Sequence, residues 1–456
     1  MRSQLFLNFC LLLWLASSSN VSLAKPIVQG LADAAAQVLG ENEVTRQQAL
    51  RHLRDAGPEG LQALLETHAS LLKQHLPVAS LGRPVPMPAA ATTPAAGSQK
   101  PVDPRTEAQW KLLQEALDAV GGQKDNVTAK LYWYTDLDQA QAAAHAAGKP
   151  ILSLRLLGKL TDELSCANSR FFRTVLYPHA EINRELREKY ILHWQTFRKV
   201  PIVTIDFGDG RKLVRTLTGN SIHYILDSQG RPIEAIPGLY GPPAFLREIQ
   251  AGLKLHDKYS HAPVSQRETL LRDYHQEQAR ATLLAWNQDL ATPANSQLNA
   301  VELEQKMTDD LWQTLATKHV ADATLDPAGV AALQAKVPFD AKNAGRIAMS
   351  KTGVELPWLK MIRNLMGSMA LDTIKNEYCL HLKMHEWFAT GTVPTDLHPL
   401  NERVYAQLFL MPSSDPWLGL STPDQFTGIF NGGRVEPASP DQSTASNQQA
   451  ATVGSH

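Results

Sequence analysis

The sequence has little cysteine, no excess of charge of either sign and, after its first residues, no long hydrophobic run. Its 456 residues include only 3 cysteines, too few for a disulfide-stapled extracellular scaffold. Lysine and arginine number 44 against 45 aspartate and glutamate residues. We therefore expect no nucleic-acid partner and no binding to anionic membrane surfaces, both of which select basic proteins. Beyond the start, no segment reaches the ~20 apolar residues needed to span a bilayer.

The first residues have the pattern of a secretory signal peptide. Arg2 precedes a mostly apolar run over residues 5–16, and small residues follow up to Ala24. Because this run is shorter than a membrane span, we expect cleavage after Ala24 and an exported protein, periplasmic or extracellular, without a membrane span. An uncleaved anchor is the competing interpretation. Cleavage would also remove Cys10 and leave two cysteines.

A chain of this length exceeds one hydrophobic core, so several folded parts are expected. Helical periodicity, a segment rich in Pro, Ala, Ser and Thr, an alternation of strands and helices, and a polar end succeed one another along the sequence. The predicted parts are a signal peptide (1–24), a helical hairpin (25–76), a disordered linker (77–106), an α/β domain with a leading helix (107–255), an all-helical C-terminal domain (256–435) and a disordered tail (436–456).

The central part carries most of the information. An alanine-rich helix, a largely apolar strand and a helix that starts at a cysteine follow one another, and further strands and turns complete the pattern. The predicted elements are helices at 136–147, 166–176, 181–190 and 245–255, strands at 151–157, 190–194, 200–207 and 222–226, and turns at 208–210 and 227–230.

Two helical signals mark the C-terminal part. Ser265 and Glu268 have the spacing of a capping box, which predicts the start of a long helix that continues toward Asp289. Residues 356–388 are strongly apolar and predict one or two helices, with Pro357 in a first turn. The C-terminal part is therefore expected to be helical and packed.

Cys166 is the leading candidate for chemistry. It follows the strand at 151–157 and opens a helix, where unpaired backbone N–H groups and the helix dipole favour a thiolate. Ser165 is the expected N-cap, and Arg170 adds a positive charge one turn along. The acidic residues just before the site oppose that effect.

Residues 131–249 resemble the thioredoxin-like superfamily. The resemblance rests on three segments: 148–152 after the alanine-rich helix, the Cys-x-x-Ser-Arg run at 166–170, and the strand and turn at 222–230. It implies a thioredoxin fold for the central domain, in a family whose members commonly exchange disulfides through a Cys-x-x-Cys pair. Cys166 matches the first cysteine of that pair.

The chain departs from this family at three places. Ser169 stands at the position of the resolving cysteine, and serine cannot form the internal disulfide, so two-thiol exchange at this site alone is excluded. Ser221 stands where the family places a cis-proline that faces the active cysteine. The connection 158–165 is longer than usual and would either reposition Cys166 or cover it.

Three interpretations of Cys166 remain: an inert buried residue, a monothiol nucleophile, and one half of a disulfide with Cys379. The first predicts an exported protein whose degenerate thioredoxin-like domain is a protein-interaction or structural module of the cell envelope. The second predicts a monothiol disulfide-exchange or isomerase activity in which Cys166 attacks and Ser169 forms a hydrogen bond near the sulfur. In either case the expected partners are other exported proteins, in the second case through a mixed disulfide.

Glu377, His381 and His385 form a second candidate group. Their four-residue spacing places them on one face of a helix, where carboxylate and imidazole groups can bind a transition metal. The competing interpretation is a polar face that packs on a neighbour, with Glu377 paired to His381. The pattern is not a recognised metal motif, so the sequence predicts neither a metal nor any other cofactor.

Overall fold

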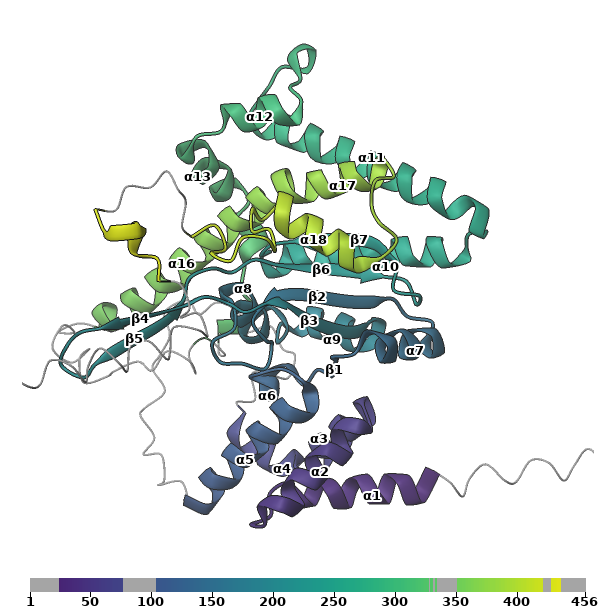
Figure 1. Ribbon diagram of the computed structural model, residues 1–456, viewed down its shortest axis with the longest axis vertical. Helices are drawn as coiled ribbons and strands as arrows, with labels where there is room; N and C mark the ends of the chain where they lie inside the picture. The colour runs from purple at the N-terminus through teal and green to yellow at the C-terminus, as the bar shows by residue number, and fades with distance from the viewer. Residues whose placement is uncertain are drawn as a thin grey trace, which may run out of the picture. The chain divides into compact units, whose positions relative to one another are not determined.

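The structure is a computed structural model that describes residues 24–76, 104–327, 329, 330, 333, 351–420 and 428–435. The expected signal peptide up to residue 23, the expected linker 77–106 up to residue 103, and the tail 436–456 lie outside these residues. The linker was predicted to end too late, since residues 104–106 already belong to a helix. The fold is mixed α/β, with a central five-stranded sheet flanked by helices (Figure 1). The chain divides into two compact units between Leu397 and His398.

The sheet has the strand order β1-β3-β2-β6-β7. Three strands run parallel: β1 (Trp133–Tyr134), β3 (Ile191–Arg198) and β2 (Ile151–Leu157). They are followed by β6 (Ser221–Leu226), antiparallel to β2, and by β7 (Pro232–Pro237), antiparallel to β6. Every residue of β2, β6 and β7 is buried, which agrees with their nearly continuous apolar sequences. The predicted strands at 151–157 and 222–226 are confirmed, whereas β7 was not anticipated.

Helices form in the segments predicted for them and pack against this sheet. Asp136 accepts a hydrogen bond from the backbone N–H of Gln139 at the start of α7, and Gly148 ends this helix at φ 63°. The helices of this region are α7 (Leu137–Ala147), α8 (Ala167–Phe171), the π-helical turn η2 (Phe172–Leu176), α9 (Ala180–Lys189) and α10 (Pro242–His261). The closing helix α10 is thus longer than the predicted 245–255.

A two-stranded ribbon lies between β3 and β6 in the sequence. It consists of β4 (Ile202–Asp206) and β5 (Lys212–Thr216), which pair antiparallel around the predicted turn at 208–210. Among the described residues these two strands pair only with each other. Several of the ribbon's large apolar side chains are exposed: Ile202, Ile205, Phe207 and Leu217.

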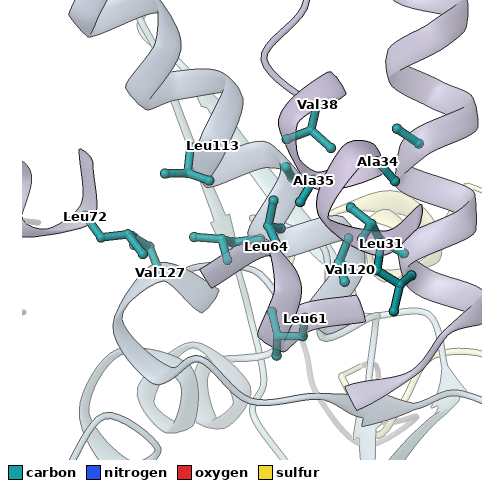
Figure 2. Close-up of a cluster of buried hydrophobic side chains, with 14 residues drawn as sticks. Leu31, Ala34, Ala35, Val38, Leu61, Leu64, Leu72, Leu113, Val120 and Val127 are labelled. Carbon is teal, nitrogen blue, oxygen red and sulfur yellow. The ribbon is translucent and has the colours of Figure 1, made fainter. Parts of the chain in front are cut away.

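The N-terminal helices form a hydrophobic core of their own (Figure 2). They are α1 (Ala24–Gln37), α2 (Glu43–Asp55), α3 (Pro58–Thr67), α4 (Ala69–His75), α5 (Pro104–Gly121) and α6 (Asn126–Ala129). The predicted hairpin turns at Gly57 and Pro58, with Gly57 at φ 71° and Pro58 in the first turn of α3. The hairpin region nevertheless holds four helices rather than two, and α5 shares their core.

The remaining part is helical, as predicted. Its elements are α11 (Val264–Asp289), η3 (Ala294–Ser296), α12 (Ala300–Lys306), α13 (Asp309–Lys318), η4 (Val320–Ala323), α16 (Lys351–Lys375), the π-helical turn η5 (Asn376–His381), α17 (Leu382–Ala389), α18 (Leu397–Gln407) and η6 (Phe430–Gly433). The predicted capping box of α11 is wrong: Pro263 precedes the helix without a side-chain cap, and Glu268 instead pairs with Arg231. Among the described helices, none has the length and apolar character needed to cross a membrane.

Candidate functional site

Cys166 lies at the N-terminus of α8, as predicted, but its side chain is closed to solvent. Its exposed fraction is 0%, and its Sγ donates a hydrogen bond to Ser169 Oγ at 3.3 Å. The Ser169 hydroxyl in turn donates to the Cys166 carbonyl at 2.8 Å. The two residues predicted as catalytic therefore contact each other, and a dissolved substrate has no access to the sulfur.

Arg173 holds the connection between β2 and α8, which leads directly into Cys166. The guanidinium of Arg173 is buried and pairs with Asp125 Oδ2 at 2.9 Å. It also donates to the Asp162 carbonyl at 2.6 Å and to Ser165 Oγ at 2.9 Å. Ser165 is therefore a partner of Arg173 rather than the N-cap of α8, a position that Cys166 itself occupies.

The segment before β6 lies against the N-terminus of α8. A Cβ atom at Gly219 would come within 2.9 Å of Ala167 Cβ and 3.1 Å of the Asn168 backbone nitrogen, so a larger residue would not fit there. Ser221 is buried, and no cis peptide bond occurs in the described part of the chain. The segment therefore has the predicted place but lacks the cis-proline geometry.

The expected disulfide alternative is not formed. Cys166 and Cys379 are both free thiols. Cys379 packs at the edge of a C-terminal hydrophobic cluster, where burial raises the pKa of its thiol to about 12. Cys379 is thus not poised as a thiolate nucleophile.

A second buried polar group lies where β7 meets the C-terminal helices. Glu234 from β7, His275 from α11, His381 from η5 and His385 from α17 converge there, and none is more than 4% exposed. One ligand atom each of Glu234, His381 and His385 lie within 4.8 Å of one another. We call these four residues the Glu234 cluster.

Short distances connect the members of the Glu234 cluster. His381 Nε2 is 3.4 Å and His385 Nδ1 is 3.9 Å from Glu234 Oε1. His275 Nδ1 is 4.0 Å from Glu234 Oε2 and 2.9 Å from His385 Nδ1. The rings of His381 and His385 stack with their centroids 4.1 Å apart.

Burial and mutual charge set the protonation of this group. Burial alone would raise the pKa of Glu234, but the surrounding histidines His275, His385 and His381 hold it below its usual value. Burial alone would lower the pKa of His381, yet its contacts with Glu234 and Glu248 raise it. Burial lowers the pKa of His275 and of His385. Glu234 is thus an anion, and burial favours the neutral forms of His275 and His385, which offer lone pairs.

The structure replaces the acid of the predicted group: His381 and His385 lie beside Glu234 and not beside Glu377. Glu377 does not belong to the Glu234 cluster; its Oε2 lies 3.9 Å from Arg247 Nη2 of α10. No ion pair joins Glu377 to His381 among the described residues, although the charge of Glu377 contributes to the raised pKa of His381. His381 and His385 do stay together.

Sequence reasoning missed Glu234, His275 and Arg173. Glu234 is the only charged residue in the strand Pro232–Pro237, which is apolar apart from it. A charge in such a buried strand was the one available signal, since buried carboxylates need partners. His275 lies in a long polar helix, where nothing in the local pattern distinguishes it.

Comparison with known proteins adds no relative to this description. No family model matches the chain, and neither the curated proteins nor the solved structures include a match.

Proposed function

We propose that this is an exported protein whose central domain is a degenerate thioredoxin-like module that acts by binding another exported protein, not by exchanging disulfides. The observation that carries the proposal is the closed Cys166, whose sulfur has no exposed surface and is hydrogen-bonded to Ser169. A thiol must reach its target to react, so a buried sulfur favours a structural role.

Two relations support the thioredoxin-like assignment. Cys166 opens a helix directly downstream of a buried parallel strand, β2. The segment that ends at Ser221 approaches this helix N-terminus, where the family has its cis-proline. The fold is thus compatible with an ancestral thiol site that has lost its second cysteine and its exposure.

The β4–β5 ribbon is the surface that we assign to the partner. Among the described residues its strands pair only with each other, which leaves backbone groups on their outer edges, and its exposed Ile205 and Phe207 offer apolar contacts. Residues 198–217 contain five basic and two acidic side chains, in a chain whose net charge is −1. Both acids are already paired inside the ribbon, Asp206 with Lys212 and Asp209 with Arg211. The partner is therefore an extended segment with alternating acidic and apolar residues, which adds a strand to the ribbon.

Alkylation of Cys166 tests the central claim. The folded chain is treated with an alkylating reagent across a pH series, and labelling of the Cys166 peptide is quantified by mass spectrometry. We expect the rate to be at least about 100-fold lower than in the urea-unfolded chain, because the thiol must wait for an opening of the structure. Ser169→Cys serves as a matched variant, and we expect it to remain reduced because the site is closed to oxidants.

The monothiol alternative makes opposite predictions. Labelling of folded Cys166 at the rate of an unfolded thiol would overturn the proposal. So would a mixed disulfide with a second exported protein that is trapped in the wild type and lost in Cys166→Ser.

Binding to the ribbon is tested with a synthetic peptide of alternating glutamate and valine. We expect binding that weakens as salt rises and that is lost in Phe207→Glu, whereas Val264→Glu, at an exposed apolar site on α11, has no effect. Equal binding by both variants would show that the ribbon is not the surface.

A further inference from the structure

The Glu234 cluster joins residues that are far apart in the chain. His275 and His385 are 110 positions apart, and Glu234 and His381 are 147 positions apart. Three different elements, β7, α11 and the η5–α17 helix, each contribute to it. A carboxylate and three imidazoles that meet in a closed interior form the donor set that zinc and similar borderline metals prefer.

We propose that the Glu234 cluster is a site for a transition metal ion, Zn²⁺ by its chemistry, with Glu234, His381 and His385 as ligands and His275 as the fourth. Four ligands at the zinc distances of roughly 2.0–2.2 Å around a tetrahedral ion lie about 3.4 Å from one another. From Glu234 Oε1, His381 Nε2 lies at 3.4 Å and His385 Nδ1 at 3.9 Å, close to that value, and the ligand atoms of these three residues all lie within 4.8 Å of one another. His275 Nδ1 lies 2.9 Å from His385 Nδ1 and 4.0 Å from the second carboxylate oxygen, Oε2, so it has to shift toward the ion to complete the set.

The surroundings of two histidines already orient them as ligands. His275 Nε2 donates to the Ile233 carbonyl at 3.0 Å, and since a carbonyl only accepts, the lone pair of the neutral ring lies on Nδ1, which faces the cluster. His381 Nδ1 lies 3.8 Å from Glu248 Oε2, which leaves Nε2 toward Glu234. Carbonyl or carboxylate partners of this kind fix the tautomer and orientation of histidines that bind metals.

The carboxylate itself has room for a cation. Glu234 Oε1 accepts a hydrogen bond from the Ala235 backbone nitrogen at 2.9 Å, whereas Oε2 is buried with no hydrogen-bond partner. A buried carboxylate oxygen without a donor is costly, and a bound cation removes that cost. Tyr274 also interacts with this carboxylate, but no donor lies within hydrogen-bond distance of Oε2.

The site is structural in kind. All four side chains are buried, and a zinc ion with four protein ligands leaves no position for substrate. Its effect is to fasten β7 of the sheet to α11 and α17. This proposal does not depend on Cys166 or on the β4–β5 ribbon.

Metal uptake by the untagged chain tests the proposal. The protein is stripped with a chelator, dialysed and titrated with Zn²⁺, and with Co²⁺ as a spectroscopic probe. We expect one equivalent per chain, ligand-field bands of a four-coordinate cobalt ion, and a rise in Tm on metal addition that the chelator reverses. His381→Gln and His385→Gln should each abolish stoichiometric uptake, and Glu248→Gln should weaken it about 10–100-fold.

A surface histidine provides the matched control. His261 is 80% exposed in its side chain, so His261→Gln should leave uptake unchanged. If the ligand variants fail to fold, the wild type still decides: a folded, stripped chain that takes up less than about a tenth of an equivalent of either ion overturns the site. Retention of one tightly bound equivalent in the folded His381→Gln/His385→Gln double variant overturns it equally.

Discussion

Cys166 and the Glu234 cluster are both buried polar sites in the same α/β unit, but they are built in different ways. The Cys166 site is local: sulfur, serine and helix N-terminus lie within four consecutive residues. The Glu234 cluster takes one residue from a strand and three from helices that follow it at a distance. The local site is visible in the sequence and closed in the structure. The Glu234 cluster could largely not be predicted from the sequence, yet its side chains are of the kinds that bind a cation.

Arg173→Met should have the largest effect on this comparison, because we expect it to open the closed Cys166 site. Removal of the buried guanidinium leaves Asp125 and Ser165 without their partner, and we expect a loss of about 3–5 kcal/mol in the free energy of unfolding. Urea unfolding measures the loss, and alkylation of Cys166 should become faster in the folded state.

The exposed Arg280 provides the control, since its pair with Glu277 lies on the surface and Arg280→Met should change stability by less than about 0.5 kcal/mol. Unchanged stability and unchanged alkylation in Arg173→Met would mean that the connection before Cys166 is held by something else.

The next prediction, Thr373→Val, concerns the C-terminal helices that contribute to the Glu234 cluster. It tests how α16 is attached beside the sheet. Thr373 is buried and accepts a hydrogen bond at 2.8 Å from the Gly241 backbone nitrogen, which precedes α10. The variant keeps the volume but leaves that N–H without an acceptor, so we expect a loss of about 1–3 kcal/mol by urea unfolding.

Thr317→Val is the matched comparison, because Thr317 makes the same helical contact to the carbonyl four residues earlier but lies exposed. If the two valine variants lose equal stability, the contact between α16 and Gly241 contributes nothing specific.

Ser169→Ala should have a smaller effect. It removes the hydroxyl that accepts from Cys166 Sγ and donates to the Cys166 carbonyl, and we expect a loss of about 1 kcal/mol. The alkylation rate of Cys166 should not change, since the sulfur stays buried. A large rise in reactivity would instead show that Ser169 protects it.

The pH dependence of stability should show the smallest effect, at His319. Hydrogen bonds to Asp322 and Asp289 raise the pKa of His319 to about 9, although burial opposes this. Because the folded pKa exceeds the unfolded value of about 6.5, this contribution is complete below pH 6.5 and is lost as the pH rises through 9. Urea midpoints of the wild type should therefore fall over that interval relative to His319→Gln. Parallel profiles would contradict the assignment.

The parts of the fold that local patterns encode could be predicted. The run at 151–157 is apolar and bounded by turn residues, and the helix at 136–147 has its own Asp136 cap and Gly148 stop, so neither needs distant information. The ribbon turn at 208–210 is specified by its glycines in the same way.

Other features depended on tertiary contacts and could not be predicted. Glu268 has the spacing of a capping box but forms an ion pair with Arg231 instead, so a tertiary contact overrides the local signal. Cys166 was predicted at a helix start, but its burial was not, and the connection before it is held by Arg173, whose partners lie up to 48 residues away. The shared site of Glu234 and His275 is recognisable only in the folded structure, where β7 lies beside α11.

The π turn η5 gives the helical run α16–η5–α17 one more residue per turn than an α-helix would use at that place. The direction of His381 and His385 is therefore encoded in the number of residues before them as well as in their identity. If the same residues followed α-helical geometry instead, everything after the turn would rotate by about 100° and carry His385 away from Glu234. A substitution scan does not change the number of residues in the turn, so it would leave this dependence unseen.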